Sequence, residues 1–278
     1  MNHTTQAKRA EALRQMHDRR NILLLPNAWD AGSARLFATR DFRAIATTSG
    51  GVAWALGYAD GEQAPLDEIL AVVRRIIRAV DLPVTVDFES GYGITPADVA
   101  TSTRAVIEAG AAGINLEDGT PGHGPLRKVQ DAAARIRAAR DAATSSGVPL
   151  VINARVDNWM HAEKDPAAPL TDAITRARAY LAAGADCVYP IGLSDPKTIK
   201  AFVQAIDAPV NVMAGAGTAP LAELAKLGVA RVSTATWFAA LALGQVDHAA
   251  RAVLETGRFD SLATDFNYMD AQRLFTAN

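Results

Sequence analysis

The sequence predicts an α/β fold of the (β/α)₈ TIM-type barrel class. Its 278 residues suit one barrel, which typically needs about 250 residues, and leave some chain for extensions. Short runs of β-branched or apolar residues alternate with alanine-rich stretches of helical periodicity, as expected for parallel strands that are buried on both faces. Eight strand–helix units follow one another along the chain, and this number favours a barrel over a doubly wound sheet.

The individual elements follow from these runs in order. The expected strands lie at residues 22–26, 43–49, 83–89, 112–118, 149–157, 185–191, 209–215 and 230–235. The expected helices lie at residues 30–40, 66–80, 97–109, 128–146, 171–183, 196–207, 219–227 and 236–256. Several helices begin with a cap signal such as Thr95-Pro96, and several end at a glycine. We also expect an N-terminal helix at about 4–20 and a helical tail at about 236–278, all within a single domain, 1–278.

The composition excludes several classes of protein. Hydrophobic residues make up 49% of the chain and charged residues 21%, which supports a large core rather than disorder. A net charge of −2 gives no basic field, so we expect no nucleic-acid partner. The single cysteine, Cys187, excludes a disulfide framework within the chain and fits a reducing compartment. The sequence contains no signal-peptide pattern and no apolar stretch near the ~20 residues of a membrane span, so we expect a cytoplasmic protein without a membrane partner.

Acidic residues gather where two neighbouring strands end, which is where barrels carry their catalytic groups. Asp87 and Glu89 are two apart, so on a strand both side chains point to the same side, and Glu117 ends the next strand. Together the three carboxylates would raise one another's pKa values unless a cation lies between them. Mg²⁺ suits such a site because it commonly takes one or two carboxylates and keeps several waters. The alternative is that Asp87 or Glu89 caps the following helix or forms a structural pair with Arg155.

Two further features predict the binding of an anionic substrate. Ser49, Gly50 and Gly51 follow the second strand and can offer a hydroxyl and free backbone N–H groups to an anion, although a tight turn is the alternative. Arg155 offers a planar guanidinium that suits a carboxylate, although a structural ion pair is the alternative.

Four segments, taken in order, resemble the isocitrate lyase/phosphoenolpyruvate mutase superfamily: TTSGGVAW, DFESGYG, INLEDG and NARVD. The resemblance covers about residues 20 to 235. It implies a barrel that exchanges its last helix between subunits of a homodimer or homotetramer. It also implies that Asp87 binds Mg²⁺ directly while Glu89 and Glu117 bind it mostly through water. By the same resemblance, the segment 49–51 and Arg155 hold the substrate carboxylate or phosphonate.

The resemblance also directs attention to two loops. Asp60, in LGYADGE, falls where the family has a mobile gating loop, and we include it among the catalytic candidates, although an ordinary solvated loop is the alternative. The loop after the fourth strand reads EDGTPGHGPLRK, without the cysteine of the lyases or the lysine and Asn-Ser of the mutases. His123 is its one conventional proton carrier, with a metal-bound water or Tyr92 as the alternative. Cys187 falls inside an expected strand, where a buried apolar role is expected.

These features lead to one functional prediction with two alternatives. We expect a lyase that uses Mg²⁺, or Mn²⁺ in its place, to break a C–C bond in a small 2-oxo or 2-hydroxy carboxylic acid. The bond would break by decarboxylation or by a retro-aldol or retro-Claisen reaction, through an enolate or oxyanion, and oxaloacetate or a substituted relative is a candidate substrate. The alternatives are phosphonopyruvate hydrolase or mutase chemistry at a C–P bond and a non-catalytic 2-oxoacid-binding protein. Apolar residues of the tail are expected to pack on another subunit: Leu262, Phe266, Met269 and Leu274.

Overall fold

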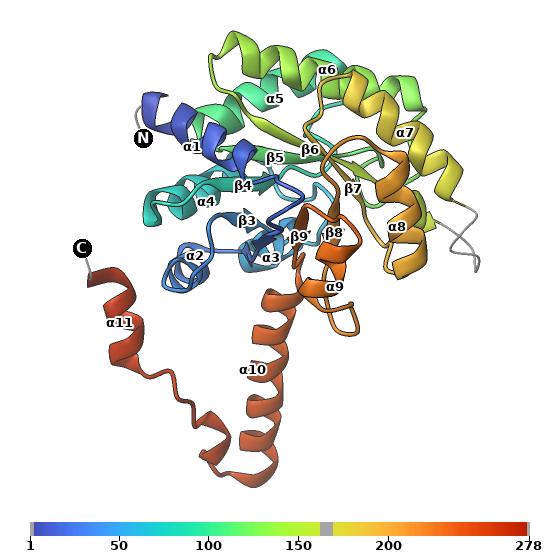
Figure 1. Cartoon of the computed structure of the whole chain (residues 1–278). Coiled ribbons are helices and arrows are strands. Elements are labelled where there is room, and N and C mark those ends of the chain that lie inside the picture. Colours follow the sequence, from blue (N-terminus) through green and yellow to red (C-terminus); the bar gives the residue numbers. More distant parts are fainter. Residues whose placement is uncertain (1–2, 162–168, 277–278) are drawn as a thin grey trace.

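A ring of short parallel strands lies at the centre of the computed structural model, which describes residues 3–161 and 169–276, and helices surround this ring (Figure 1). The strands are β1 (Leu23–Leu25), β2 (Asn27–Ala28), β3 (Ile45–Thr47), β4 (Val84–Asp87), β5 (Gly113–Glu117), β6 (Val151–Val156), β7 (Cys187–Pro190), β8 (Asn211–Met213) and β9 (Arg231–Ser233). Every strand pair is parallel, and strands and helices alternate along the chain as the apolar periodicity predicts.

The strands form two hydrogen-bonded sets, in the orders β1-β9-β8 and β2-β3-β4-β5-β6-β7. The first expected strand is split at Pro26, which has no N–H to donate, while its carbonyl accepts the N–H of Ala46 at 2.9 Å. At the other junction a parallel bridge joins Val188 to Val210, and the Val188 N–H donates to the Pro209 carbonyl at 3.0 Å. The eight expected strand positions therefore follow one another around the ring, and the predicted (β/α)₈ class is confirmed.

The helices outside the ring match the expected positions, with one addition. They are α1 (His3–Gln15), α2 (Ala31–Ala38), α3 (Ser49–Leu56), α4 (Leu66–Ala79), α5 (Pro96–Glu108), α6 (Val129–Ser145), α7 (Leu170–Ala182), α8 (Pro196–Ala205), α9 (Leu221–Lys226), α10 (Trp237–Thr256) and α11 (Tyr268–Thr276), with short 3₁₀ turns at Asn158–His161 and Asp260–Leu262. The addition is α3, where the sequence was interpreted as a strand end and a loop. Thr48 caps this helix and Gly57, with φ 89°, ends it, so two glycines in its first turn do not prevent it.

The N-terminal helix α1 covers one end of the barrel, packing against β6. Its Leu13 is fully buried, and a Cβ on Gly113 of β5 would lie 3.0 Å from the Leu13 Cδ2 atom. The Gln6 side chain donates to the carbonyls of Ile107 and Ala111, which fixes the helix to the end of α5. With this end closed, the open end of the barrel is the one where the strands finish.

The C-terminal tail leaves the barrel along α10 and returns to pack α11 against α2 (Figure 1). It exposes many large apolar side chains, among them Leu241, Leu243, Val246, Leu254, Phe259, Leu262, Phe266, Met269 and Phe275. Such a concentration of exposed apolar surface marks an interaction site in a globular protein. No helix in the described part of the chain is long and apolar enough to cross a membrane.

We propose that a second copy of the chain covers this tail, which would make the protein a homodimer or homotetramer. Light scattering at micromolar concentration should then give a multiple of the 29.3 kDa chain mass. Val246→Asp places a charge on the exposed apolar face and should shift the mass towards one chain, whereas Gln245→Asp on the same helix is the matched control. A wild-type mass of a single chain would contradict the proposal.

Candidate active site

A cavity of about 200 Å³ lies at the C-terminal ends of the strands. Its lining comprises Asn27, Thr48, Ser49, Asp60, Asp87, Asn115, His123, Arg155, Met160, Tyr189, Ile191, Met213, Ser233, Ala235 and Thr236. Five predicted site residues are among them: Ser49, Asp60, Asp87, His123 and Arg155. The other predicted residues do not line it: Gly50, Gly51, Glu89 and Glu117.

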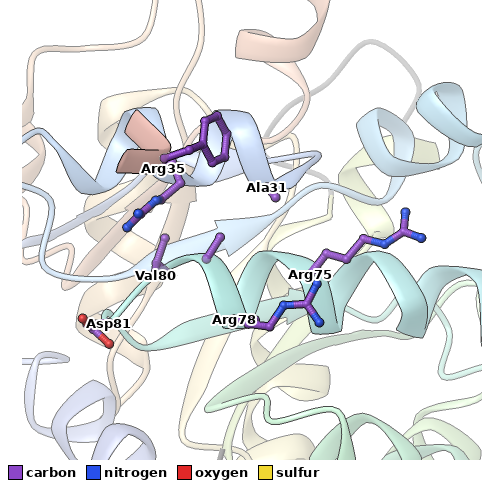
Figure 2. Close-up of a pocket in the computed structure, with 8 residues that line it drawn as sticks. Ala31, Arg35, Arg75, Arg78, Val80 and Asp81 are labelled. Carbon is purple, nitrogen blue, oxygen red and sulfur yellow. The ribbon is translucent and has the colours of Figure 1, made fainter. Parts of the chain in front are cut away.

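A larger hollow, of about 400 Å³, lies among the outer helices α2, α4 and α11 (Figure 2). Three arginines, Arg35, Arg75 and Arg78, line it together with Asp81. None of the predicted site residues reaches this hollow, so size alone does not identify the active site. The smaller cavity is the candidate because the polar strand ends converge there.

Asp87, the last residue of β4, has its carboxylate held at the N-terminus of α3. Its Oδ2 atom accepts the Ser49 N–H at 3.1 Å, and its own N–H donates to the Thr47 hydroxyl at 2.9 Å. On the other side, the Asn115 Nδ2 atom lies 3.4 Å from Oδ1. The carboxylate thus lies beside the positive end of the α3 dipole.

The segment Ser49-Gly50-Gly51 forms the first turn of α3 rather than a loop, which corrects the sequence interpretation. A Cβ on Gly51 would lie 2.7 Å from the Thr48 Cγ2 atom and 2.9 Å from the Trp29 Cβ atom, so only glycine fits. The Ser49 N–H donates to Asp87 and the Gly51 N–H to the Thr48 hydroxyl, so the Gly50 N–H and the Ser49 hydroxyl remain as the predicted donors for an anion.

Glu89 does not share the orientation predicted for it. The strand β4 ends at Asp87, and Glu89 has a φ of 47°, so the alternation of a strand no longer applies. Its Oε1 atom accepts the N–H groups of Gly61 at 3.0 Å and Glu62 at 2.7 Å, and its Oε2 atom accepts the Tyr92 hydroxyl. The carboxylate therefore holds the 57–63 loop rather than pointing into the cavity.

The pKa of Glu89 is raised to about 7, chiefly because the carboxyl group is buried. Its hydrogen bond from Tyr92 opposes the shift, whereas the negative charges of Asp87 and Asp60 add to it. Burial also raises the pKa of the Tyr92 hydroxyl well above its ordinary value, which disfavours this residue as a proton carrier near neutral pH.

Arg155 and Glu117 form a buried ion pair across β5 and β6. The Arg155 Nη1 atom lies 2.6 Å from the Glu117 Oε2 atom, while Nε and Nη2 donate to the Asp157 carboxylate at 2.6 and 2.9 Å. Asp157 thus binds the planar edge of the Arg155 guanidinium that was predicted to bind a substrate carboxylate. Burial raises the pKa of Glu117, and the charge of Arg155 opposes that shift.

A divalent cation fits this arrangement only in a mostly hydrated form. Within residues 3–161 and 169–276 no three or more His, Cys, Asp or Glu side chains are grouped as direct ligands. Asp87 alone among the predicted ligands presents its carboxylate to the cavity, and Glu89 and Glu117 lie beside it. All three supply oxygen donors, and burial, with a smaller contribution from neighbouring carboxylates, raises the pKa values of the two glutamates. One direct carboxylate with water in the remaining positions is the pattern that Mg²⁺ takes.

Two loops meet over the cavity. The Gly122 N–H donates to the Gly61 carbonyl at 3.1 Å, and a Cβ on Gly61 would lie 2.7 Å from the Gly122 Cα atom. This contact brings the His123 Nε2 atom to 3.6 Å from the Asp60 Oδ2 atom, with 54% of the His123 side chain exposed. Both residues predicted in these loops therefore reach the cavity together.

A buried network that the sequence interpretation missed anchors the His123 loop. Asp118 accepts the Tyr180 hydroxyl at 2.6 Å, the Arg176 Nη1 atom at 3.1 Å and the Asp157 N–H at 2.9 Å. Burial raises the pKa of Asp118. Arg176 and Tyr180 are four residues apart on α7 and therefore lie on the same face of that helix. This spacing could have indicated from the sequence that the two side chains share a partner. Cys187, as predicted, is fully buried in β7.

The chain is similar to several known proteins. The sequence model of the phosphoenolpyruvate phosphomutase family matches residues 13–254. A Burkholderia cenocepacia structure described as a lyase/mutase superposes with a TM-score of 0.91 at 40% identity, covering 98% of each chain. The 2-methylisocitrate lyase of Escherichia coli is 32% identical over 82% of this chain and 77% of its own length. The oxaloacetate decarboxylase of Paraburkholderia xenovorans is also 32% identical, over 82% of this chain and 75% of its own length.

Barrel, site and comparisons together define an enzyme. The chain belongs to the phosphoenolpyruvate phosphomutase family, within the phosphoenolpyruvate mutase/isocitrate lyase superfamily, which confirms the resemblance predicted from its four segments.

Proposed function

We propose that the protein is a Mg²⁺-dependent lyase that breaks a C–C bond in a small 2-oxo or 2-hydroxy carboxylic acid. The observation that carries the proposal is the Asp87 carboxylate, which lines the cavity directly beside the N-terminus of α3. A cation site and an anion site are thereby adjacent, as a substrate with an oxygen next to its carboxylate requires. Two relatives at 32% identity are a lyase and a decarboxylase by name, which supports cleavage of a C–C bond.

Asp87 would hold Mg²⁺, or Mn²⁺ in its place, directly, and Glu89 and Glu117 would hold it through water. When bound, the ion supplies Lewis-acid polarisation of the 2-oxo or 2-hydroxy oxygen. The Gly50 N–H, in the first turn of α3, and the Ser49 hydroxyl would bind the substrate carboxylate. Arg155 contributes positive charge from the β6 side of the cavity. At about 200 Å³ the cavity is below the usual size for drug-sized ligands and suits a small acid.

Residues of the two loops would carry out the proton transfer. In a 2-oxo acid the electron pair of the broken C–C bond passes into the 2-oxo group as an enolate, and the carbon that has lost its substituent must then gain a proton. In a 2-hydroxy acid the hydroxyl loses its proton and becomes the oxo group, while the electron pair passes to the departing fragment, which must gain the proton. His123 lies at the cavity wall and can deliver that proton. Asp60, whose Oδ2 atom lies 3.6 Å from the imidazole Nε2 atom, would hold the ring in place at the cavity.

Chemistry at a C–P bond is the second candidate. The family whose model matches the chain is described as phosphoenolpyruvate phosphomutase, and the α3 N-terminus suits a phosphonate as well as a carboxylate. The same cation and anion positions would serve either reaction. Only the bond that breaks distinguishes them.

A turnover screen tests the proposed function. The protein should be incubated with 2-oxo, 2-hydroxy and phosphono acids, each with Mg²⁺ and with EDTA, and the products followed by NMR. We expect Mg²⁺-dependent cleavage of a C–C bond in at least one carboxylic acid, and no cleavage in EDTA. Phosphate release from phosphonopyruvate as the only reaction would favour the second candidate, and cleavage that persists in EDTA would contradict the role of the ion.

Substitution of His123 tests the proton transfer. His123→Gln should lower kcat by about 10²–10⁴-fold, the usual contribution of general acid–base catalysis, and should leave substrate affinity much less affected. The matched control is His248→Gln, at an exposed position of α10. Wild-type kcat in His123→Gln on the true substrate would make His123 a bystander and favour a metal-bound water.

A further inference from the structure

Arg231, the first residue of β9, is a positive charge buried inside the barrel. Its exposed fraction is 0%, and in the strand register it lies beside Leu23 and Asn211. Burying an arginine is unfavourable unless a partner compensates for the lost water. Burial accordingly lowers the pKa of Arg231. The sequence interpretation assigned no role to this residue.

The contacts of Arg231 do not supply that compensation locally. Its Nη2 atom donates to the Asn115 Oδ1 atom at 3.1 Å. Its Nε and Nη1 atoms make no hydrogen bond with the part of the chain that the structure describes. No carboxylate of the described residues is bonded to these two atoms, and Asp87 is the carboxylate whose charge raises the pKa of Arg231. An arginine that served packing alone would be a costly choice at this position.

Asn115 connects this charge to the active site. Its Oδ1 atom accepts two hydrogen bonds, from the Arg231 Nη2 atom at 3.1 Å and from the Asn153 Nδ2 atom at 2.8 Å. Because both neighbours present donors, the amide oxygen must face them and the NH₂ group must face the other way. That group lies 3.4 Å from the Asp87 Oδ1 atom. The orientation of the Asn115 amide is therefore set by Arg231 and Asn153, neither of which lines the cavity.

We propose that Arg231 is a positioning residue that acts through the amide of Asn115 to hold the Asp87 carboxylate in its cation-binding orientation. This inference rests on the proposed function, because it presumes that Asp87 binds the ion. Asp87 would be held on both oxygens, by the Ser49 N–H on Oδ2 and by Asn115 on Oδ1. Groups that orient a metal ligand in this way typically change metal affinity by about 10–100-fold when they are lost.

Loss of Arg231 has two opposing effects on Mg²⁺ affinity, and the test must separate them. Removing a positive charge favours the cation, whereas releasing Asn115 disfavours it. In the Asn115→Leu background only the charge effect remains, since the connecting amide is gone. A double-mutant cycle of Arg231→Met and Asn115→Leu therefore isolates the positioning effect.

The measurement is Mg²⁺ affinity by calorimetry for the four proteins of the cycle, without substrate. We compare the factor by which Arg231→Met changes the Mg²⁺ dissociation constant in the two backgrounds. We expect this factor to be about tenfold larger, meaning weaker binding, when Asn115 is present than when it is replaced by leucine. Asn211→Leu is the matched control, because Asn211 is equally buried and is the register partner of Arg231. It should change Mg²⁺ affinity by no more than about twofold.

Equal effects of Arg231→Met in the two backgrounds, with wild-type Mg²⁺ binding intact, would overturn the positioning role and leave the proposed function standing. Absence of Mg²⁺ binding by the wild-type chain would instead overturn the proposed function, and this inference with it. Should Arg231→Met fail to fold, Arg231→Leu, which likewise removes the donor to Asn115, takes its place in the same cycle with the same expected sign.

Discussion

Carboxylates crowd the C-terminal ends of β4 and β5, and each needs a different partner to be tolerated there. Asp87 receives the first N–H of α3, Glu89 receives the backbone of the 57–63 loop, and Glu117 receives Arg155. Burial and mutual repulsion still raise the pKa values of both glutamates. The surrounding loops and the α3 helix are arranged around this excess of negative charge, and a bound cation would offset it.

Because Glu89 holds the 57–63 loop, the acidic cluster is linked to the cover of the cavity. That loop contacts the 118–127 loop at Gly61 and Gly122, where two glycines allow the backbones to meet. The second loop is anchored in turn through Asp118. The candidate proton carrier His123 therefore depends for its place on the same charges that would bind the ion.

The periodicity of the sequence was enough to predict the barrel and nearly every helix, because burial on both faces leaves long apolar runs in each strand. It did not predict where a strand stops. Glu89 turns away because β4 ends two residues earlier, and α3 forms because Thr48 caps a segment whose glycines indicate a turn. The Arg155–Asp157 pair could have been foreseen, since residues two apart on a strand share a side. The contact of Arg231 with Asn115 could not have been predicted, because the alternation of side chains along a strand does not show which inward polar groups meet across a barrel.

The most direct test of this account is Mg²⁺ binding measured by calorimetry on the wild type, Asp87→Ala and Asp81→Ala. Asp81 is a fully exposed carboxylate outside the site and serves as the control. The account predicts that the wild type and Asp81→Ala bind Mg²⁺ alike, while Asp87→Ala loses binding and keeps its far-ultraviolet circular dichroism. Unchanged Mg²⁺ affinity in a folded Asp87→Ala protein would contradict it.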